Sequence, residues 1–129
     1  MRKVMIWVMG ALIAMTATAN GQPAELDPEN TIYLDLEYGR VVVQLRPDLA
    51  PNHVDRFKEL ARSGFYDGLT WHRVIAGFMA QTGDPVGDGS GGSDLPNLEA
   101  EFNSEKHVRG SLSMARAASP NSANSQFYL

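Results

Sequence analysis

The sequence contains no cysteine, and this absence removes several kinds of chemistry at once. A chain without thiols has no disulfide framework, no thiolate nucleophile and no zinc site built on cysteine. Basic residues are also scarce, since eleven lysines and arginines stand against fifteen acidic residues and the formal net charge is −4. Binding to nucleic acid depends on positive charge that neutralises phosphates, so no nucleic-acid partner is expected.

Long hydrophobic runs are confined to the N-terminus. Two basic residues precede the uncharged, apolar segment 4–15, and Ala17-Thr18-Ala19 places small residues at the two positions that a signal peptidase reads. The segment is shorter than the ~20 residues that a membrane-spanning helix needs. The pattern predicts a signal peptide over residues 1–19 and a leader or linker over residues 20–30. The protein is therefore expected to be exported, periplasmic or secreted, and without a membrane anchor after cleavage.

From residue 31 onwards the pattern is that of one mainly β domain. Apolar residues alternate over 31–37 and 40–45 across a glycine-containing break, which predicts a β-hairpin with one buried face. Pro51 to Ser63 is the one segment with a helical apolar stripe, and Gly64 is expected to end that helix. Further strands are predicted over 69–75, 78–82, 110–115 and 126–129, with a long loop over 83–103. A barrel or a sandwich is the expected architecture.

Several familiar motifs fail because their structural context is wrong. Residues 87–92 fit the dinucleotide pattern G-x-G-x-x-G, but a polar segment with a proline follows where that motif requires a helix. Asp84, Asp88 and Asp94 lack the alternating spacing of a calcium loop, and we interpret them as solvated turn residues. The three histidines do not have the spacing of metal ligands. The sequence thus predicts neither a metal site nor a cofactor.

Four ordered motifs carry the most specific signal in the chain. They are FYDGLTWHRVIAGFMAQTGDP at 65–85, EAEF at 99–102, RGSLSMAR at 109–116 and PNSANSQFY at 120–128. Together they resemble cyclophilins, which are peptidyl-prolyl cis-trans isomerases, over essentially all of residues 31–129. The resemblance implies a closed antiparallel β-barrel with capping helices. It also implies an enzyme that acts without a cofactor, rotating X–Pro bonds in unfolded or extended polypeptides and so assisting folding. A monomer is kept as the default expectation, since no sequence feature sets the oligomeric state.

The resemblance also implies the residues of the site. Arg73 matches the catalytic arginine, whose permanently charged guanidinium would donate a hydrogen bond to the prolyl nitrogen in the twisted transition state. Phe78, Met79 and Tyr128 match the apolar pocket for the proline ring. The remaining matched positions, which would contact the substrate's backbone or its groove, are His72, Gln81, Ala115, Arg116, Ala117 and Gln126. Of these, His72 is expected to be packed and not to act as an acid or base, because the reaction transfers no proton.

The sequence departs from the family pattern in ways that bear on function. Tyr128 stands where phenylalanine is usual, so its hydroxyl needs a partner or water. The family's chain continues past Leu129 with further strands and a second helix, so we expect an incomplete barrel in a truncated chain that is not by itself a competent enzyme. A non-catalytic, cyclophilin-like module that binds proline-containing segments is the alternative left open. Arg73 discriminates between the two, because a pure binder needs no donor aimed at the prolyl nitrogen.

Overall fold

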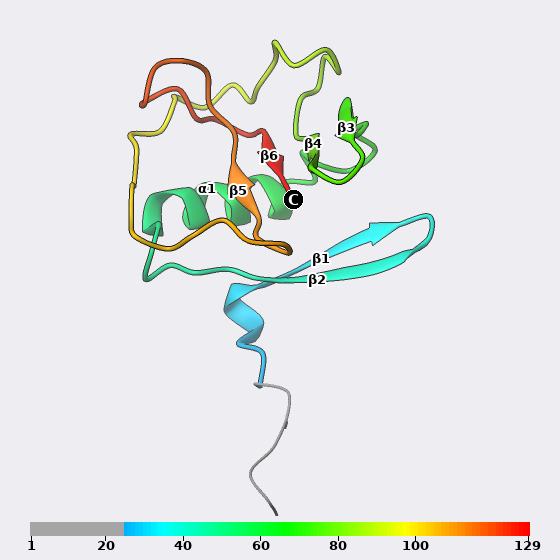
Figure 1. Cartoon of the computed structure of the whole chain (residues 1–129), viewed down its shortest axis with the longest axis vertical. Coiled ribbons are helices and arrows are strands. Elements are labelled where there is room, and N and C mark those ends of the chain that lie inside the picture. The colour runs from blue at the N-terminus through cyan, green and yellow to red at the C-terminus, as the bar shows by residue number, and fades with distance from the viewer. Residues whose placement is uncertain (1–24) are drawn as a thin grey trace, which may run out of the picture.

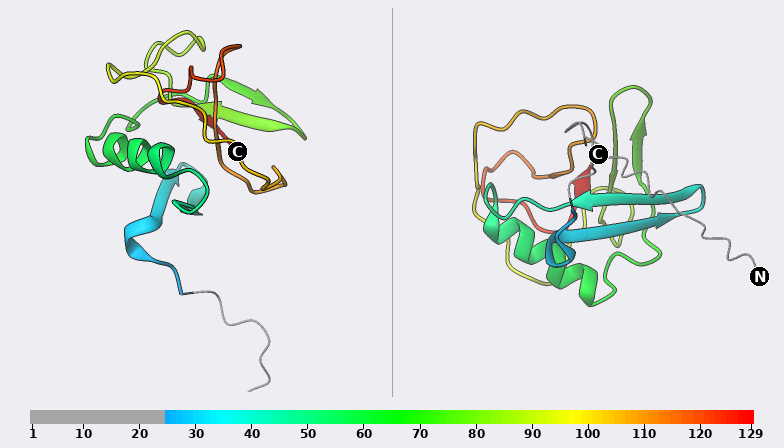
Figure 2. Two further views of the ribbon diagram at one scale, coloured as in Figure 1. Left: turned by 90° about the vertical axis from the view of Figure 1, so that its left-hand side faces the viewer. Right: turned by 90° about the horizontal axis from the view of Figure 1, so that it is seen from below.

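A computed structural model describes residues 25–129 as two antiparallel β-sheets, one α-helix and long loops (Figures 1 and 2). The predicted signal peptide and the first part of the predicted leader lie outside the described residues. The rest of the leader contains a 3-10 turn, Pro28–Asn30, in which the Asp27 side chain accepts a hydrogen bond from the Glu29 N–H. Within residues 25–129, no helix has the length and apolar character needed to cross a membrane.

The first sheet is the predicted hairpin. Strand β1 (Thr31–Leu36) pairs with strand β2 (Gly39–Gln44), with Thr31 opposite Gln44 and Leu36 opposite Gly39. The alternating apolar residues of one face pack against the core, whereas Tyr33 on the other face is 55% exposed. The hairpin projects past the helix to one side of the molecule (Figure 1). The period-two pattern of the sequence therefore predicted the hairpin correctly. The predicted face is packed at Ile32, Leu34 and Val43, but Leu36 and Val41, near the turn, are exposed.

Helix α1 (Pro51–Arg62) supplies much of the core. It ends one residue before the predicted boundary, and Gly64 follows with a φ of 75° and an N–H bonded to the Ala61 carbonyl. That left-handed conformation costs glycine little, which explains why the helix stops there. The Phe57 ring packs edge-on against Phe127, with 5.0 Å between centroids. This contact joins the helix to the second sheet.

The N-terminus of α1 is capped by a residue from a distant loop. The preceding residue, Ala50, has no side chain that can cap the helix. Instead, the Glu101 carboxylate accepts hydrogen bonds of 3.0 Å from the backbone N–H groups of Asn52 and His53. It also lies 2.6 Å from Nδ1 of His53, and both side chains are mostly buried. A negative charge at this end of a helix is favourable because it satisfies free N–H groups and opposes the helix dipole.

We expect Glu101→Ala to lower the free energy of unfolding at pH 7 by about 1–2 kcal/mol, the usual cost of losing a helix cap. Burial acts to raise the pKa of Glu101, but hydrogen bonds from His53 and Asn52 outweigh it and hold the pKa below its ordinary value. A carboxyl with a depressed pKa in the folded state stabilises the fold above its unfolded pKa of ~4.3 and loses this effect as the pH falls further.

The measurement is urea denaturation of parent and variant at pH 7 and at about pH 3. The gap between the two proteins should shrink at the lower pH. The matched control is Glu99→Ala, which removes an exposed carboxylate two residues away. A stability gap that is equal at both pH values would contradict a role for the ionised carboxylate.

The second sheet has four short strands in the order β3-β4-β6-β5, all antiparallel. They are β3 (Arg73–Ile75), β4 (Met79–Thr82), β5 (Ser113–Met114) and β6 (Phe127–Tyr128). Each is shorter than predicted, because ladder pairing extends only where a partner strand lies alongside. Pairing does continue one step beyond β6, since Ala80 and Leu129 exchange two backbone hydrogen bonds of 3.0 Å.

The two sheets do not join into a closed barrel within the described residues. The hairpin, α1 and the four-stranded sheet instead pack around a shared cluster of Leu45, Val54, Phe57 and Phe127. The mainly β class with a single helix is confirmed. The closed barrel that the resemblance implies is not formed by residues 25–129, which instead form two separate sheets.

Candidate functional site

A row of residues crosses the four-stranded sheet on the face that points away from the core. The strand register places Arg73 opposite Gln81, Gln81 opposite Tyr128, and Tyr128 opposite Ser113. Directly opposed residues of neighbouring strands project to the same face, so these side chains form one continuous line. Phe127, the neighbour of Tyr128, points the other way into the core and is 1% exposed. The sheet thus brings together predicted site residues that are up to 55 positions apart in the sequence.

Arg73 begins the row and is exposed. Among residues 25–129 its guanidinium has neither an ion-pair nor a hydrogen-bond partner, so its donors face solvent. Strand β3 holds its backbone against Gln81, which fixes where the side chain starts. A charged donor that a strand holds in place, and that has no such partner within the described residues, is available to a ligand.

Two glutamine side chains lie next to Arg73 and are linked to each other. Nε2 of Gln81 donates to Oε1 of Gln126 at 2.8 Å. Nε2 of Gln126 donates in turn to the carbonyl oxygens of Gly89 and Gly91, at 2.9 and 2.8 Å. Both N–H groups of Gln126 are therefore occupied, whereas Gln81 keeps its carbonyl oxygen and one N–H for a polar ligand. This arrangement suits Gln81 for binding a peptide backbone.

Tyr128 has the polar partner that its hydroxyl requires. The hydroxyl lies 3.1 Å from Nδ1 of His107, and Oγ of Ser113 lies 3.2 Å from Nε2 of the same ring. A neutral imidazole has one donor and one acceptor nitrogen, so one hydroxyl donates to His107 and the other accepts from it. His107 was not among the predicted site residues. The only sequence signal for it was the unmet hydrogen bond of Tyr128.

The predicted apolar pocket is only partly formed by its three residues. Met79 shares the face of Gln81 by strand alternation and is buried, and Tyr128 lies in the same row. Phe78 lies just before β4 and is 72% exposed, so it does not line an enclosed cavity. Val74 and Ile75 are also exposed, which makes the β3–β4 hairpin an apolar edge beside Arg73.

His72 is placed differently from the other site residues. Both of its ring nitrogens are buried, and neither has a hydrogen-bond partner among residues 25–129. The ring lies close to Gly89, so it packs beneath the loop that holds Gln126. This position agrees with a packed histidine and leaves no ring nitrogen exposed to a substrate.

Ala115, Arg116 and Ala117 follow β5 along the far edge of the sheet. The Ala115 N–H donates to the Gln126 carbonyl at 2.8 Å, which ties this segment to β6. The Arg116 guanidinium lies 5.8 Å from the centre of the Phe102 ring, and its Nη1 donates to the carbonyls of Ala117 and Ala118. These contacts orient Arg116 without neutralising its charge.

Asp84 orders the loop that binds the Gln126 side chain, and the interpretation of Asp84 as a solvated residue was wrong. Its side chain is buried, at 1% exposure, because the 84–91 loop folds around it. Oδ1 accepts from the Val86 N–H at 2.8 Å, and Oδ2 accepts from the N–H groups of Asp88 and Gly89 at 3.1 and 2.6 Å. Burial acts to raise the pKa of Asp84, but these backbone donors hold it below its ordinary value. The loop so ordered presents the carbonyls that bind Gln126.

Gly91 is required by this arrangement. A Cβ atom at this position would collide with Oδ1 of Asp84 and with the Val86 side chain. The glycines of this loop therefore allow the backbone to fold around a carboxylate. This role differs from the phosphate binding for which the G-x-G-x-x-G pattern is known.

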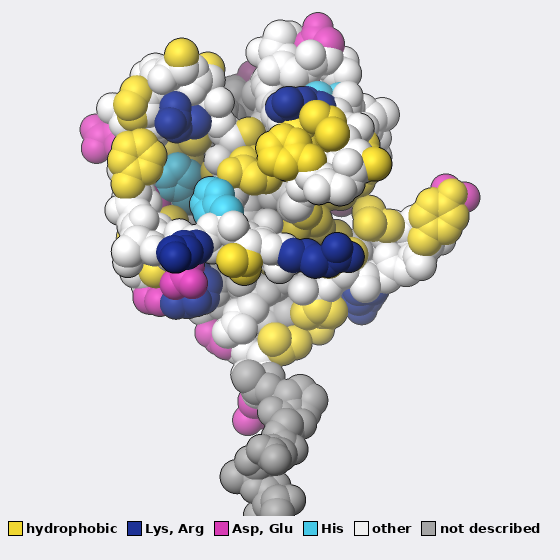
Figure 3. All heavy atoms as spheres, in the orientation of Figure 1, with side chains coloured by type: hydrophobic (Ala, Val, Ile, Leu, Met, Phe, Trp, Pro, Cys, Tyr) yellow, Lys and Arg dark blue, Asp and Glu magenta, His cyan; other side chains and the backbone are white. Residues whose placement is uncertain are grey.

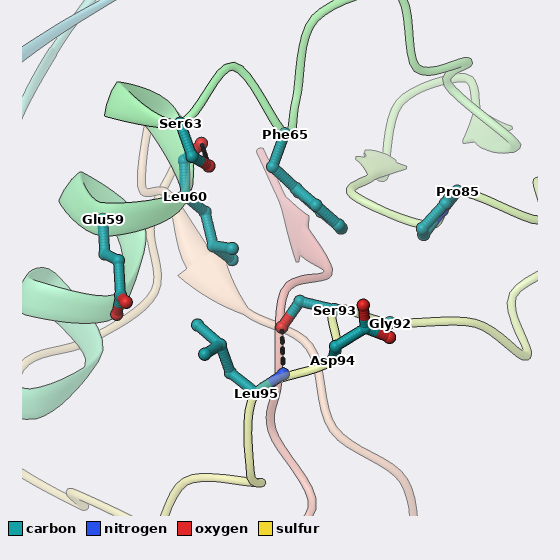
Figure 4. Close-up of a pocket in the computed structure, with 9 residues that line it drawn as sticks. All are labelled: Glu59, Leu60, Ser63, Phe65, Pro85, Gly92, Ser93, Asp94 and Leu95. Carbon is teal, nitrogen blue, oxygen red and sulfur yellow. Dashed lines mark hydrogen bonds between the residues drawn. The ribbon is translucent and has the colours of Figure 1, made fainter.

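A separate cavity of about 540 Å3 lies between α1 and the loop that precedes β5. Figure 4 shows Leu60, Phe65 and Leu95 projecting toward its centre, with polar groups around them. None of the predicted site residues lines it. The cavity is therefore distinct from the Arg73 row. Nor do residues 25–129 contain a cluster of three or more histidine, aspartate or glutamate side chains suited to a metal ion.

The geometry defines a class of protein: a mainly β domain with an open sheet face at whose start stands an arginine that has no partner among residues 25–129. The comparisons with known proteins identify the family. The family model for cyclophilin type peptidyl-prolyl cis-trans isomerase/CLD matches residues 31–129. A probable peptidyl-prolyl cis-trans isomerase of Brucella suis is 49% identical over 130 residues, covering 92% of this chain and 66% of the relative. Peptidyl-prolyl cis-trans isomerase B of Bacillus subtilis is 46% identical over 101 residues, covering 77% and 70%.

Solved structures agree. A Cryptosporidium parvum cyclophilin type peptidyl-prolyl cis-trans isomerase matches with a TM-score of 0.72 at 33% identity, covering 77% of this chain and 65% of that one. A second structure of that protein, with a TM-score of 0.71 at 34% identity, was determined in the presence of the dipeptide Ala-Pro and covers 76% of this chain and 65% of that one. The chain belongs to the cyclophilin type peptidyl-prolyl cis-trans isomerase family. It spans about two thirds of the length of the Brucella relative, at 66%.

Proposed function

We propose that this protein is a peptidyl-prolyl cis-trans isomerase that speeds rotation about X–Pro bonds in unfolded or extended polypeptides and so assists folding. The observation that carries the proposal is the row of Arg73, Gln81 and Tyr128 across one sheet, with Arg73 exposed and the other two half-buried, in a chain of this family. Rotation about the bond faces a barrier of ~18–20 kcal/mol because the nitrogen lone pair is delocalised into the carbonyl. In the twisted transition state the lone pair returns to nitrogen, which can then accept a hydrogen bond.

Each residue of the row has a role in lowering that barrier. The Arg73 guanidinium donates to the prolyl nitrogen only when the bond is twisted, and this difference between transition state and ground state is what accelerates the step. Gln81 uses its free oxygen and N–H to orient the peptide backbone. Met79 and the ring of Tyr128 offer apolar contact to the proline ring, which has no donor of its own.

The alternative of a non-catalytic binding module has no support among the relatives, which are named as isomerases. Export is proposed on the pattern of residues 1–19 alone. N-terminal sequencing of protein recovered from the periplasm or culture medium tests it. A chain that begins at Asn20 is expected, and a chain that retains Met1 would contradict cleavage.

Isomerisation is expected to proceed at nearly constant rate from about pH 6 to pH 9 and to be unaffected by chelators. A guanidinium keeps its charge across this range and the reaction moves no proton, so no group has to titrate. The measurement is the exchange rate of a short proline peptide with the full-length protein, followed by NMR with and without EDTA. A bell-shaped profile centred near neutrality would implicate a titrating histidine and contradict the mechanism.

A further inference from the structure

The basic residues of the described chain fall into groups that differ in their partners. Four are paired with carboxylates: Arg40 with Asp35, Arg46 with Asp48, and Lys58 and Arg62 with Glu29. Arg56 is buried and donates to the carbonyls of Pro96 and Asn124. The others have no carboxylate within ion-pair distance among residues 25–129, and they are Arg73, Lys106, Arg109 and Arg116.

All four of these residues lie around the face that bears the row. Arg73 begins it. Lys106 and Arg109 flank His107, whose ring is bonded to Tyr128 and Ser113. Arg116 follows β5 directly beyond Ala115. Figure 3 shows lysine and arginine side chains spread around exposed apolar and histidine side chains on this face, with most of the acidic ones at its margins.

This concentration of positive charge runs against the charge of the whole protein, which is −4. Two of the nearby carboxylates are bound within the protein. Asp84 is buried and surrounded by backbone N–H groups, and Glu101 is bound to α1. Asp88 accepts hydrogen bonds from Ser90. None of the four cations forms an ion pair with a carboxylate among residues 25–129. The exposed Glu105 beside Lys106 offsets one charge, so Lys106, Arg109 and Arg116 together keep a net positive charge to which an external anion can bind.

The distance between neighbouring strands predicts how far from the proline a negative charge on a bound peptide should lie. Neighbouring strands are ~4.8 Å apart, so the three steps from Arg73 to Ser113 span about 14 Å. An extended peptide advances ~3.3 Å per residue. For a peptide that lies along the row with its proline at Arg73, a residue about four positions away lies over the edge that carries Lys106, Arg109 and Arg116.

We propose that this edge selects polypeptides that carry aspartate or glutamate three to five residues from the proline. The inference rests on the proposed isomerase function and adds a substrate class to it. Because the charges are exposed, the preference arises from long-range attraction and weak contacts, so it acts on substrate binding and falls as salt is added.

The experiment compares kcat/KM of the full-length protein on matched peptides by NMR exchange, which needs no coupling protease. The parent peptide has only alanines around one proline. Two glutamates, or two lysines, replace alanines three and four positions from the proline, on either side. We expect one glutamate series to exceed the neutral peptide by roughly three- to tenfold, and the lysine peptides to fall below it. The difference should vanish near 1 M salt, where the screening length is ~3 Å.

The variant that tests the edge is the double substitution Lys106→Glu with Arg109→Glu. It should bring the ratio of glutamate to neutral kcat/KM down to about one. The matched control is Arg62→Glu, which reverses a charge on the α1 side and should leave the ratio unchanged. Equal rates on all peptides, or equal loss of preference in the control, would overturn the inference and leave the isomerase function standing. Absence of activity on every peptide would overturn the proposed function itself.

Discussion

Arg73→Ala is expected to lower kcat/KM for X–Pro isomerisation by about 100- to 1000-fold, the usual effect of removing one donor that binds developing charge in a transition state. The side chain is exposed and has no partner among residues 25–129, so its removal breaks no contact of the fold. Thermal unfolding should therefore be unchanged while the rate collapses. That separation of activity from stability identifies a residue that acts on the substrate.

Two further variants sharpen this test. Arg73→Lys keeps the charge but loses the planar arrangement of donors, so its rate should lie between those of the parent and the alanine variant. Arg62→Ala removes another exposed arginine, from α1, and should leave the rate unchanged. An Arg73→Ala rate within twofold of the parent would show that this arginine is not catalytic.

Asp84→Ala is expected to cost more than about 3 kcal/mol in the free energy of unfolding. The substitution removes three part-buried hydrogen bonds from the N–H groups of Val86, Asp88 and Gly89 to a carboxylate. A hydrogen bond to a charged group contributes about 1.5–3 kcal/mol. The loop that binds Gln126 through Gly89 and Gly91 would loosen with it. Activity should therefore fall even in the fraction of molecules that remain folded.

Urea denaturation measures the stability, and NMR exchange on a proline peptide measures the activity. Asp88→Ala is the matched control, because Asp88 is an exposed aspartate of the same loop whose side chain bonds only to Ser90. It should behave like the parent. Gly91→Ala should resemble Asp84→Ala, since its added Cβ meets the same carboxylate. Parent-like stability of Asp84→Ala would contradict the role of the carboxylate in holding the loop.

The elements that the sequence predicted best are those defined by a local repeat. The alternation of Ile32 and Leu34 identified the hairpin, and the spacing of Val54 and Phe57 identified α1. Both patterns depend only on neighbours a few positions away. The strands of the second sheet were overestimated in length, because how far a strand extends depends on its partner and not on its own composition.

The residues that were misjudged or missed have partners far along the chain. Glu101 binds Asn52 and His53 across 49 and 48 positions, and His107 meets Tyr128 across 21. Asp84 was taken for a solvated residue because glycine and aspartate are typical of exposed turns. Its burial follows from the path of the whole loop. Arg73 and its neighbours were found by resemblance, since an exposed arginine on a strand has no distinctive pattern of its own.

The remote cap of α1 also has a consequence for how the chain folds during synthesis. A helix of twelve residues is marginal in water without outside support. Its cap, Glu101, leaves the ribosome about fifty residues after Asn52. Until then the helix can only form and melt repeatedly, with Phe57 exposed. Closing so long a segment is entropically costly, so the step that secures α1 comes late, when the 99–103 loop docks. Helix α1 is therefore synthesised early but is among the last parts of the described chain to become stable.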